Sequence, residues 1–116
     1  MSDPSPKYIV VFVTTKDIEE ASSIGQRLLE KRLVACANIV NPVQSLFWWE
    51  GKIDQGQEAL MILKTQYSQF EEVTKEVKAA HSYSVPEILA LPVLDGQKDY
   101  LKWVDDSIVK DGEMKG

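Results

Sequence analysis

The amino-acid sequence predicts an α+β domain with a ferredoxin-like split βαβ arrangement. The first observation is the order of predicted elements, β-α-β-β-α-β followed by a C-terminal helix. The second is the length of 116 residues, which fits one domain. The third is that the first strand is apolar on both alternating faces, so both of its faces should be buried.

The first part of the chain gives a leader, a strand and a helix. Residues 1–6 are polar and proline-rich, and we expect a disordered leader. The β-branched and aromatic run at 8–15 predicts the first strand. Asp17 and Glu20 form a predicted capping box, and apolar residues recur after them at helical spacing, so a helix is expected over 17–32.

A hairpin is predicted next. The runs 34–40 and 43–49 form one long strand with a bend or bulge at Pro42, because proline cannot donate a hydrogen bond to a central ladder. The polar sequence at 54–57 is a turn signal. The chain is then expected to return as a strand over 58–66.

The last part of the chain begins with a capping box of Ser68 and Glu71, which predicts a helix over 68–80. A loop follows at 81–87, and a strand at 87–93 that ends near an edge at Pro92. Asp99 is expected to cap the last helix. The predicted domain spans 7–110, and residues 111–116 are expected to form a flexible tail.

Composition excludes several classes of function. A formal net charge of −5 makes nucleic acid a poor partner, since phosphate binding relies on clustered Lys and Arg. No apolar run is long enough for a membrane span, and the N-terminus lacks signal-peptide regions. The single cysteine, Cys36, permits no intrachain disulfide. We therefore expect a cytoplasmic protein with no nucleic-acid or membrane partner.

The loop at 81–87 is the first candidate for function, because it carries the only histidine, His81. Loops placed by a rigid scaffold often carry functional residues. His81, Tyr83, Lys64 and two glutamates would make an acid–base set. No nucleophile–base pair, phosphate loop or HExxH spacing accompanies them, so we do not expect an enzyme.

The apolar strands also predict an oligomer. Trp48 and Trp49 are consecutive, so their side chains point to opposite sides of their strand. The last helix is too short to cover the second face of the sheet. Other copies of the chain are the economical cover, because large exposed apolar patches usually mark interfaces. The pattern alone does not fix the number of subunits.

Several motifs stand together in one order along the chain. They are Leu33-Val34-Ala35-Cys36-Ala37-Asn38, Trp49-Glu50-Gly51-Lys52-Ile53, Glu58, Ile62-Leu63-Lys64-Thr65, His81-Ser82-Tyr83, Pro86-Glu87 and Tyr100-Leu101-Lys102-Trp103. With these motifs the chain resembles the CutA divalent-ion tolerance proteins over about residues 8–109. The resemblance implies a homotrimer similar to the PII signalling proteins. It also implies a link to tolerance of divalent metals, copper above all.

Two positions depart from the family pattern. Some copper-linked members carry a cysteine at the end of the first strand, where this chain has Val13, and this weakens a thiolate copper site. Ser82 stands where the family motif usually has proline, and we expect it to loosen the loop slightly. Cys36 is expected to pack as a small hydrophobe rather than bind metal.

The expected ligand is Cu(II) or another divalent metal, held weakly in an intersubunit cleft, with no organic cofactor. The expected metal ligands are His81, Glu58 and Glu87. Trimer interfaces can gather an imidazole with carboxylates of a neighbour, a combination that suits copper. The expected cleft residues are Trp49, Lys64, Tyr83 and Trp103.

Two alternatives remain open at this point. The first is a PII-like sensor or adaptor trimer that binds a small anionic ligand in the same cleft, where Lys64 would supply the positive charge. The second is a stable trimeric scaffold without a specific ligand. Trp49 and Trp103 could equally be core or interface anchors, because Trp dominates packing energetics.

Overall fold

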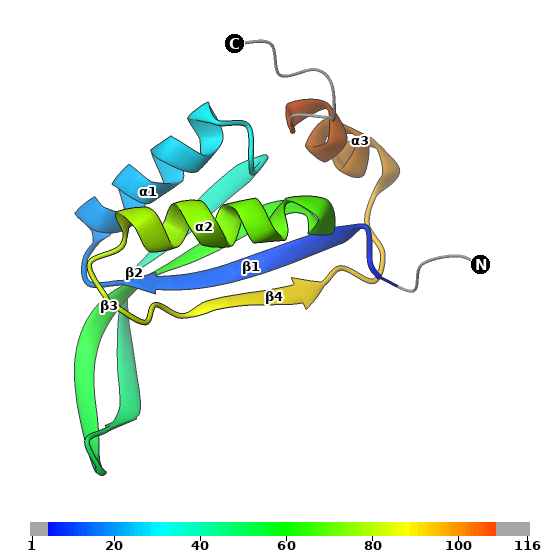
Figure 1. The fold of residues 1–116 in the computed structure, drawn as a ribbon. Helices are drawn as coiled ribbons and strands as arrows, with labels where there is room; N and C mark the ends of the chain where they lie inside the picture. The colour runs from blue at the N-terminus through cyan, green and yellow to red at the C-terminus, as the bar shows by residue number, and fades with distance from the viewer. Residues whose placement is uncertain (1–4, 109–116) are drawn as a thin grey trace.

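The computed structural model describes residues 5–108 and shows a four-stranded antiparallel sheet with three helices (Figure 1). The strand order is β2-β3-β1-β4, and the order of elements predicted from the sequence is confirmed. Residues 1–4 and 109–116 lie outside the described residues; they include most of the predicted leader and all of the predicted tail at 111–116. The elements are β1 (Tyr8–Thr15), α1 (Ile18–Glu30), β2 (Cys36–Trp49), β3 (Lys52–Gln66), a 3-10 turn (Tyr67–Gln69), α2 (Phe70–Ala80), β4 (Ile88–Pro92) and α3 (Lys98–Ser107).

The hydrophobic core lies between the sheet and the two longer helices. Helices α1 and α2 lie side by side on one face of the sheet (Figure 1). Alternate residues of the central strands β1 and β3 point to this face, because side chains alternate along a strand. The largest fully buried side chains are Ile9, Val11 and Val13 of β1, Met61 and Leu63 of β3, Ile24 and Leu28 of α1, and Val73 and Val77 of α2.

The opposite face of the sheet, which we call the open face, is also apolar. The antiparallel register places its residues next to one another across three strands. None of them is fully buried, and Leu89 and Leu91 are 56% and 41% exposed. The predicted two-sided apolar character of β1 is therefore present, but α1 and α2 cover only one side. The open face is formed by Val10, Phe12, Leu60, Ile62, Leu89 and Leu91.

The start and end of α1 follow local hydrogen-bonding rules. The Asp17 carboxylate accepts a hydrogen bond from the Glu20 backbone N–H at 2.8 Å, as the predicted capping box requires. The Glu20 carboxylate accepts from Lys16 N–H at 3.2 Å, one residue before the expected partner. At the other end, Arg32 adopts a left-handed conformation with φ of 60°. Leu33 N–H then bonds to the Leu28 carbonyl, which closes the helix in a Schellman motif.

The predicted caps of α2 and α3 were wrong. Ser68 lies in the 3-10 turn before α2, and its hydroxyl contacts the Gln66 side chain at 3.4 Å instead of capping the helix. The first turn of α3 is capped by Gln97, whose side-chain oxygen accepts from Tyr100 N–H at 2.7 Å. Asp99 is already inside α3. Gln97 satisfies the start of α3, whereas Gln69 at the start of α2 makes no side-chain capping bond, so the capping pattern alone misplaced both boundaries.

The predicted position of the hairpin turn was also wrong. The chain turns at Glu50-Gly51, with φ of 50° and 80°, and Trp49 pairs directly with Lys52. Two consecutive residues with positive φ form the tight turn whose twist matches a hairpin. Residues 54–57, the predicted turn, are part of β3. The predicted bulge at Pro42 is confirmed by a register shift between Val40 and Val43.

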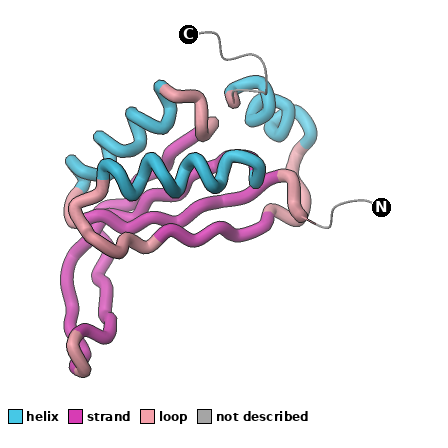
Figure 2. Tube along the Cα trace, viewed as in Figure 1, coloured by secondary structure: helices cyan, strands magenta, loops and turns pink. Residues whose placement is uncertain are grey.

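The far half of the β2–β3 hairpin projects away from the rest of the domain (Figures 1 and 2). Large apolar side chains lie along it and face solvent. Trp48 and Trp49 are 74% and 60% exposed, and Ile53 on the opposite strand is 68% exposed. The projecting hairpin and the open face therefore leave two neighbouring apolar surfaces uncovered in a single chain.

A polar network anchors α3 to the ends of β1 and β3. Asp105 accepts hydrogen bonds from the Tyr8 hydroxyl at 2.8 Å and from the Gln66 amide at 2.6 Å, and Lys7 lies 3.5 Å away. Burial works to raise the pKa of Asp105, but these bonds and the Lys7 charge outweigh it and hold the pKa below its usual value. Val104 and Ile108 of this segment are buried beside Ala35.

We expect Leu63→Ala to destabilise the fold by about 2–5 kcal/mol, because it removes a fully buried side chain and leaves a cavity. Leu29→Ala is the matched control, since Leu29 lies on α1 and is 41% exposed. Urea denaturation at equal protein concentration measures both variants. An equal loss of stability in the two variants would contradict the assignment of the core to this face.

Candidate functional site

The candidate site is an open groove of about 960 Å³ between the loop at 81–87 and the base of the projecting hairpin. Four of the residues singled out in the sequence line it: Trp49 on β2, Glu58 on β3, and Tyr83 and Glu87 in and after the loop. The remaining lining residues are Thr14, Gln44, Ser45, Leu46, Phe47, Asp54, Ser84 and Val85.

Glu58 is the most firmly held acidic group of the groove. Its Oε1 accepts a hydrogen bond from the Ser45 hydroxyl at 2.6 Å, and its Oε2 accepts one from the Tyr83 hydroxyl at 2.8 Å. Ser45 lies across the hairpin on β2, whereas Tyr83 comes from the loop. A carboxylate has about four lone-pair sites, so each oxygen keeps acceptor capacity toward the groove.

Tyr83 is strongly perturbed by this contact. Burial of the ring raises the pKa of Tyr83 to about 12, and the hydrogen bond to Glu58 and the negative charge of Glu58 add to the effect. Deprotonation would place a phenolate beside a carboxylate, which like charges disfavour. The hydroxyl is therefore a stable hydrogen-bond donor to Glu58 at neutral pH.

Both ring nitrogens of His81 are engaged inside the protein. Nε2 lies 2.8 Å from the Thr14 carbonyl oxygen, and Nδ1 accepts the Tyr83 backbone N–H at 3.0 Å. A carbonyl oxygen only accepts, so Nε2 carries the proton and the ring is the neutral tautomer. In this arrangement His81 holds the loop against the end of β1, and its ring lies 4.7 Å from that of Tyr83.

Ser82 fastens the loop to α1, contrary to the expectation that it loosens it. Its backbone N–H donates to Glu20 Oε2 at 2.7 Å, and its hydroxyl donates to Glu20 Oε1 at 3.1 Å. Burial works to raise the pKa of Glu20, but hydrogen bonds from Lys16 and Ser82 outweigh it and hold the pKa below its usual value. Proline lacks both donors, so only a residue such as serine can make this contact.

Two predicted cleft residues, Lys64 and Trp103, do not line the groove of a single chain. Lys64 is six residues beyond Glu58 on the same strand, which corresponds to about 20 Å of extended chain. Its ammonium group contacts the side chain of Asn38, not a glutamate. Trp103 lies on α3, where its ring packs 5.5 Å from Tyr100.

Neither Cys36 nor the position of Val13 lies at the groove. Cys36 pairs with Lys64 across β2 and β3, and its sulfur contacts Asn38 Oδ1 at 3.6 Å. It is half-buried at the start of β2, opposite the part of β3 that is remote from the groove. Val13 is fully buried on the helix-covered face of β1, so neither position brings a thiol to the groove.

The charge of the groove favours cations. Three carboxylates line it, from Asp54, Glu58 and Glu87, and its lining includes no Lys, Arg or His. A groove lined by one sign of charge attracts the opposite sign. Among residues 5–108, however, no group of three or more His, Cys, Asp and Glu side chains is close enough to hold a metal ion.

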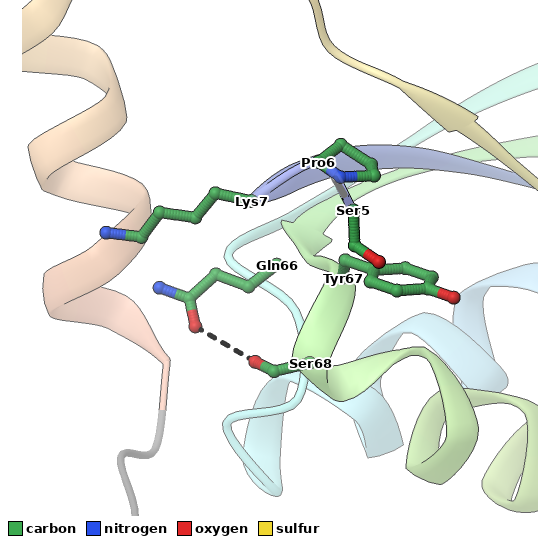
Figure 3. Close-up of a pocket in the computed structure, with 6 residues that line it drawn as sticks. All are labelled: Ser5, Pro6, Lys7, Gln66, Tyr67 and Ser68. Carbon is green, nitrogen blue, oxygen red and sulfur yellow. Dashed lines mark hydrogen bonds between the residues drawn. The ribbon is translucent and has the colours of Figure 1, made fainter. Parts of the chain in front are cut away.

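A second hollow, of about 560 Å³, lies at the other end of the sheet between the start of β1 and the 3-10 turn. Lys7 and Gln66 line it and extend toward α3 (Figure 3), where both contact Asp105. Gln66 also accepts a weak hydrogen bond from Ser68. The main polar groups of this second hollow, Lys7 and Gln66, thus anchor α3. The groove at Glu58 is therefore the better candidate site.

Sequence reasoning missed three residues that build the site: Glu20, Ser45 and Thr14. Glu20 was recognised only as part of a capping box. Ser45 carries no motif, although the hairpin places it across from Gly56, two residues before Glu58. Thr14 contributes its backbone carbonyl to His81, and a backbone atom gives no residue-type signal.

Comparison with known proteins gives a consistent result. The family model described as "CutA1 divalent ion tolerance protein" matches residues 9–107. The "Divalent-cation tolerance protein CutA" of Archaeoglobus fulgidus is 49% identical over 98 residues, which cover 84% of this chain and 95% of that protein. The chloroplastic CutA 1 protein of Oryza sativa is 41% identical over 99 residues, 85% of this chain and 56% of the relative.

Solved structures agree with these relatives. The structure described as the periplasmic divalent cation tolerance protein CutA from Archaeoglobus fulgidus matches with a TM-score of 0.84 and 48% identity, covering 86% of this chain and 97% of that chain. The crystal structure of CutA1 from Oryza sativa matches with a TM-score of 0.88 and 38% identity, covering 94% and 100%. Within residues 5–108 no helix is both long and apolar enough to cross a membrane.

The Tyr83–Glu58 contact predicts a specific pH dependence. The pKa of Tyr83 in the folded chain, about 12, lies above the ordinary 10.0. The folded chain therefore holds this proton more tightly than the unfolded chain does. The resulting stability is fully present below about pH 10 and is lost as pH rises toward 12.

We expect Glu58→Gln to move the Tyr83 titration down toward the ordinary value, because it removes the charge that opposes phenolate formation. Absorbance titration of the phenol groups measures the shift, and Tyr83→Phe identifies the step that belongs to Tyr83. Tyr67→Phe, at a ring that is 44% exposed, is the control. A Tyr83 step that stays in place in Glu58→Gln would show that the contact is absent in solution.

Proposed function

The chain belongs to the CutA1 divalent ion tolerance protein family, which is not an enzyme family, and we propose that it binds divalent cations weakly at the groove beside His81. The observation that carries the proposal is the acidic lining of the groove, with Glu58 fixed between two hydroxyl donors. Carboxylate oxygens are ligands for divalent metals, and hydrogen-bonded partners orient them.

Copper is the divalent metal that we propose first. Glu58 and Glu87 would supply carboxylate oxygens, and His81 would supply the imidazole that copper favours. Nδ1 of His81 already accepts the Tyr83 N–H, so copper would replace this one hydrogen bond while the Tyr83 hydroxyl keeps its bond to Glu58. The cost of replacing the bond at Nδ1 would make the binding weak rather than tight.

We further propose that the site is completed in a homotrimer. Two features support it: the apolar open face and the apolar hairpin remain uncovered in one chain, and the described residues of one chain provide fewer than three donors at any one place. Association would cover these surfaces, because burial of apolar area is the main driving force of obligate interfaces. A neighbouring copy would then add ligands at the groove.

The alternative of a small anionic ligand finds less support. Lys64, the cation expected to bind it, is at the other end of β3, and the groove lining is acidic. An anion would have to overcome repulsion from three carboxylates. For location we propose the cytoplasm, with which the single cysteine is compatible. One relative is named as chloroplastic and one similar structure as periplasmic.

We expect Glu58→Gln and Glu87→Gln each to weaken Cu(II) binding about tenfold, because each removes a charged oxygen ligand. Isothermal titration calorimetry with Cu(II), with Zn(II) and with nucleotides measures the affinities. Glu72→Gln, which removes a charge from the exposed side of α2, is the control.

Three results would count against the proposal. Equal Cu(II) affinity in Glu58→Gln and Glu72→Gln would remove Glu58 from the site. An unchanged affinity in His81→Ala would remove the imidazole. Binding of a nucleotide without binding of either metal would favour the anionic-ligand alternative.

A further inference from the structure

The contact between Glu20 and Ser82 joins helix α1 to the loop of the candidate site. Two donors of Ser82, the backbone N–H and the hydroxyl, reach the two oxygens of one carboxylate at 2.7 and 3.1 Å. Glu20 lies in the first turn of α1 and also accepts from Lys16 N–H at 3.2 Å. The positive end of the helix dipole stabilises an ionised carboxylate there. The anchor is thus itself fixed by three donors.

Within residues 5–108, two other hydrogen bonds hold the loop at 81–87 on the body of the domain. One is the bond between His81 and the Thr14 carbonyl, and the other is the bond between the Tyr83 hydroxyl and Glu58. Ser82 lies between these two anchor residues in the chain. The following residues are more open to solvent, and Val85 is 88% exposed. The Glu20 contact therefore restrains the segment that carries both His81 and Tyr83.

The orientation of Glu58 depends on this restraint. The Tyr83 hydroxyl is the donor that holds Oε2, while Ser45 holds Oε1. If Ser82 comes away from Glu20, Tyr83 gains freedom and Oε2 loses its fixed donor. A metal-binding carboxylate that loses such a supporting hydrogen bond is less ordered before binding. Ordering it when a cation binds then costs conformational entropy.

We propose that Glu20 and Ser82 form a latch that positions Glu58 for cation binding, acting through Tyr83. The inference rests on the proposed cation-binding function and adds a positioning role for Glu20, a residue on a different element from every proposed ligand. The latch touches no bound cation itself. Its effect is to keep the carboxylate of Glu58 in one orientation.

The experiment compares three variants with the wild-type full chain. Glu20→Ala opens the latch. Glu19→Ala removes the same charge from an exposed position on the same turn and is the matched control. Glu20→Ala with Ser82→Pro tests rescue, because proline stiffens the loop without needing Glu20. His81 has φ of −85° and ψ of 143°, the conformation that a residue before proline prefers.

Two readouts are measured on each chain: Cu(II) affinity by calorimetry, and amide hydrogen exchange of the segment 81–87. Glu20→Ala is expected to weaken Cu(II) binding about tenfold, the lower end of the effect of removing a supporting group, and to speed exchange in the segment. Glu19→Ala is expected to match the wild type in both. The rescue variant is expected to recover slow exchange and most of the lost affinity.

The outcomes separate the latch from the proposed function. If the wild type binds Cu(II) and Glu20→Ala binds it equally well while exchange in the loop speeds up, the latch does not position the site. This result would overturn the latch and leave the proposed cation binding standing. A rescue variant that regains slow exchange but not affinity also overturns the latch. If the wild type binds no divalent cation, the proposed function and the inference fall together.

Discussion

The central strands of the sheet are apolar on both sides, and the rest of the structure depends on this constraint. The helices α1 and α2 cover one side, where Val11 and Leu63 are fully buried. The other side presents Phe12 and Ile62, which are only half-buried. A sheet with two apolar faces needs cover on both, because exposed apolar area costs free energy in proportion to its size. A single chain supplies half of that cover.

The candidate site lies where this uncovered surface meets the loop at 81–87. The hairpin carries Ser45 and Glu58, and the loop brings Tyr83 to them. Helix α1 contributes through Glu20, which holds Ser82 next to Tyr83 in the loop. The hydrogen bonds of the site are mostly between distant parts of the chain, so they depend on the folded arrangement of those parts. The function proposed for the groove is thus a consequence of the same packing that closes the core.

The sequence predicted the order of the elements well, because apolar periodicity is a local property of the chain. It failed where geometry depends on distant partners. The turn at Glu50-Gly51 requires two residues with positive φ, and of the two only glycine is a residue type that favours this conformation. The more polar segment at 54–57 was therefore wrongly predicted to be the hairpin turn. Lys64 was expected in the same cleft as His81, but within one chain it lies six residues beyond Glu58 on β3 and contacts Asn38. The contact of Glu20 with Ser82 was not predicted, since the capping pattern already gave Glu20 a local role at the start of α1.

We propose that other copies of the chain cover the open face and complete the groove. Native mass spectrometry, supported by light scattering in solution, tests this assembly. We expect a particle with about three times the 13.1 kDa mass of one chain. We also expect Ile62→Asp, which places a charge on the open face, to break the particle into smaller species. A wild-type mass of one or two chains would show that no trimer covers the open face.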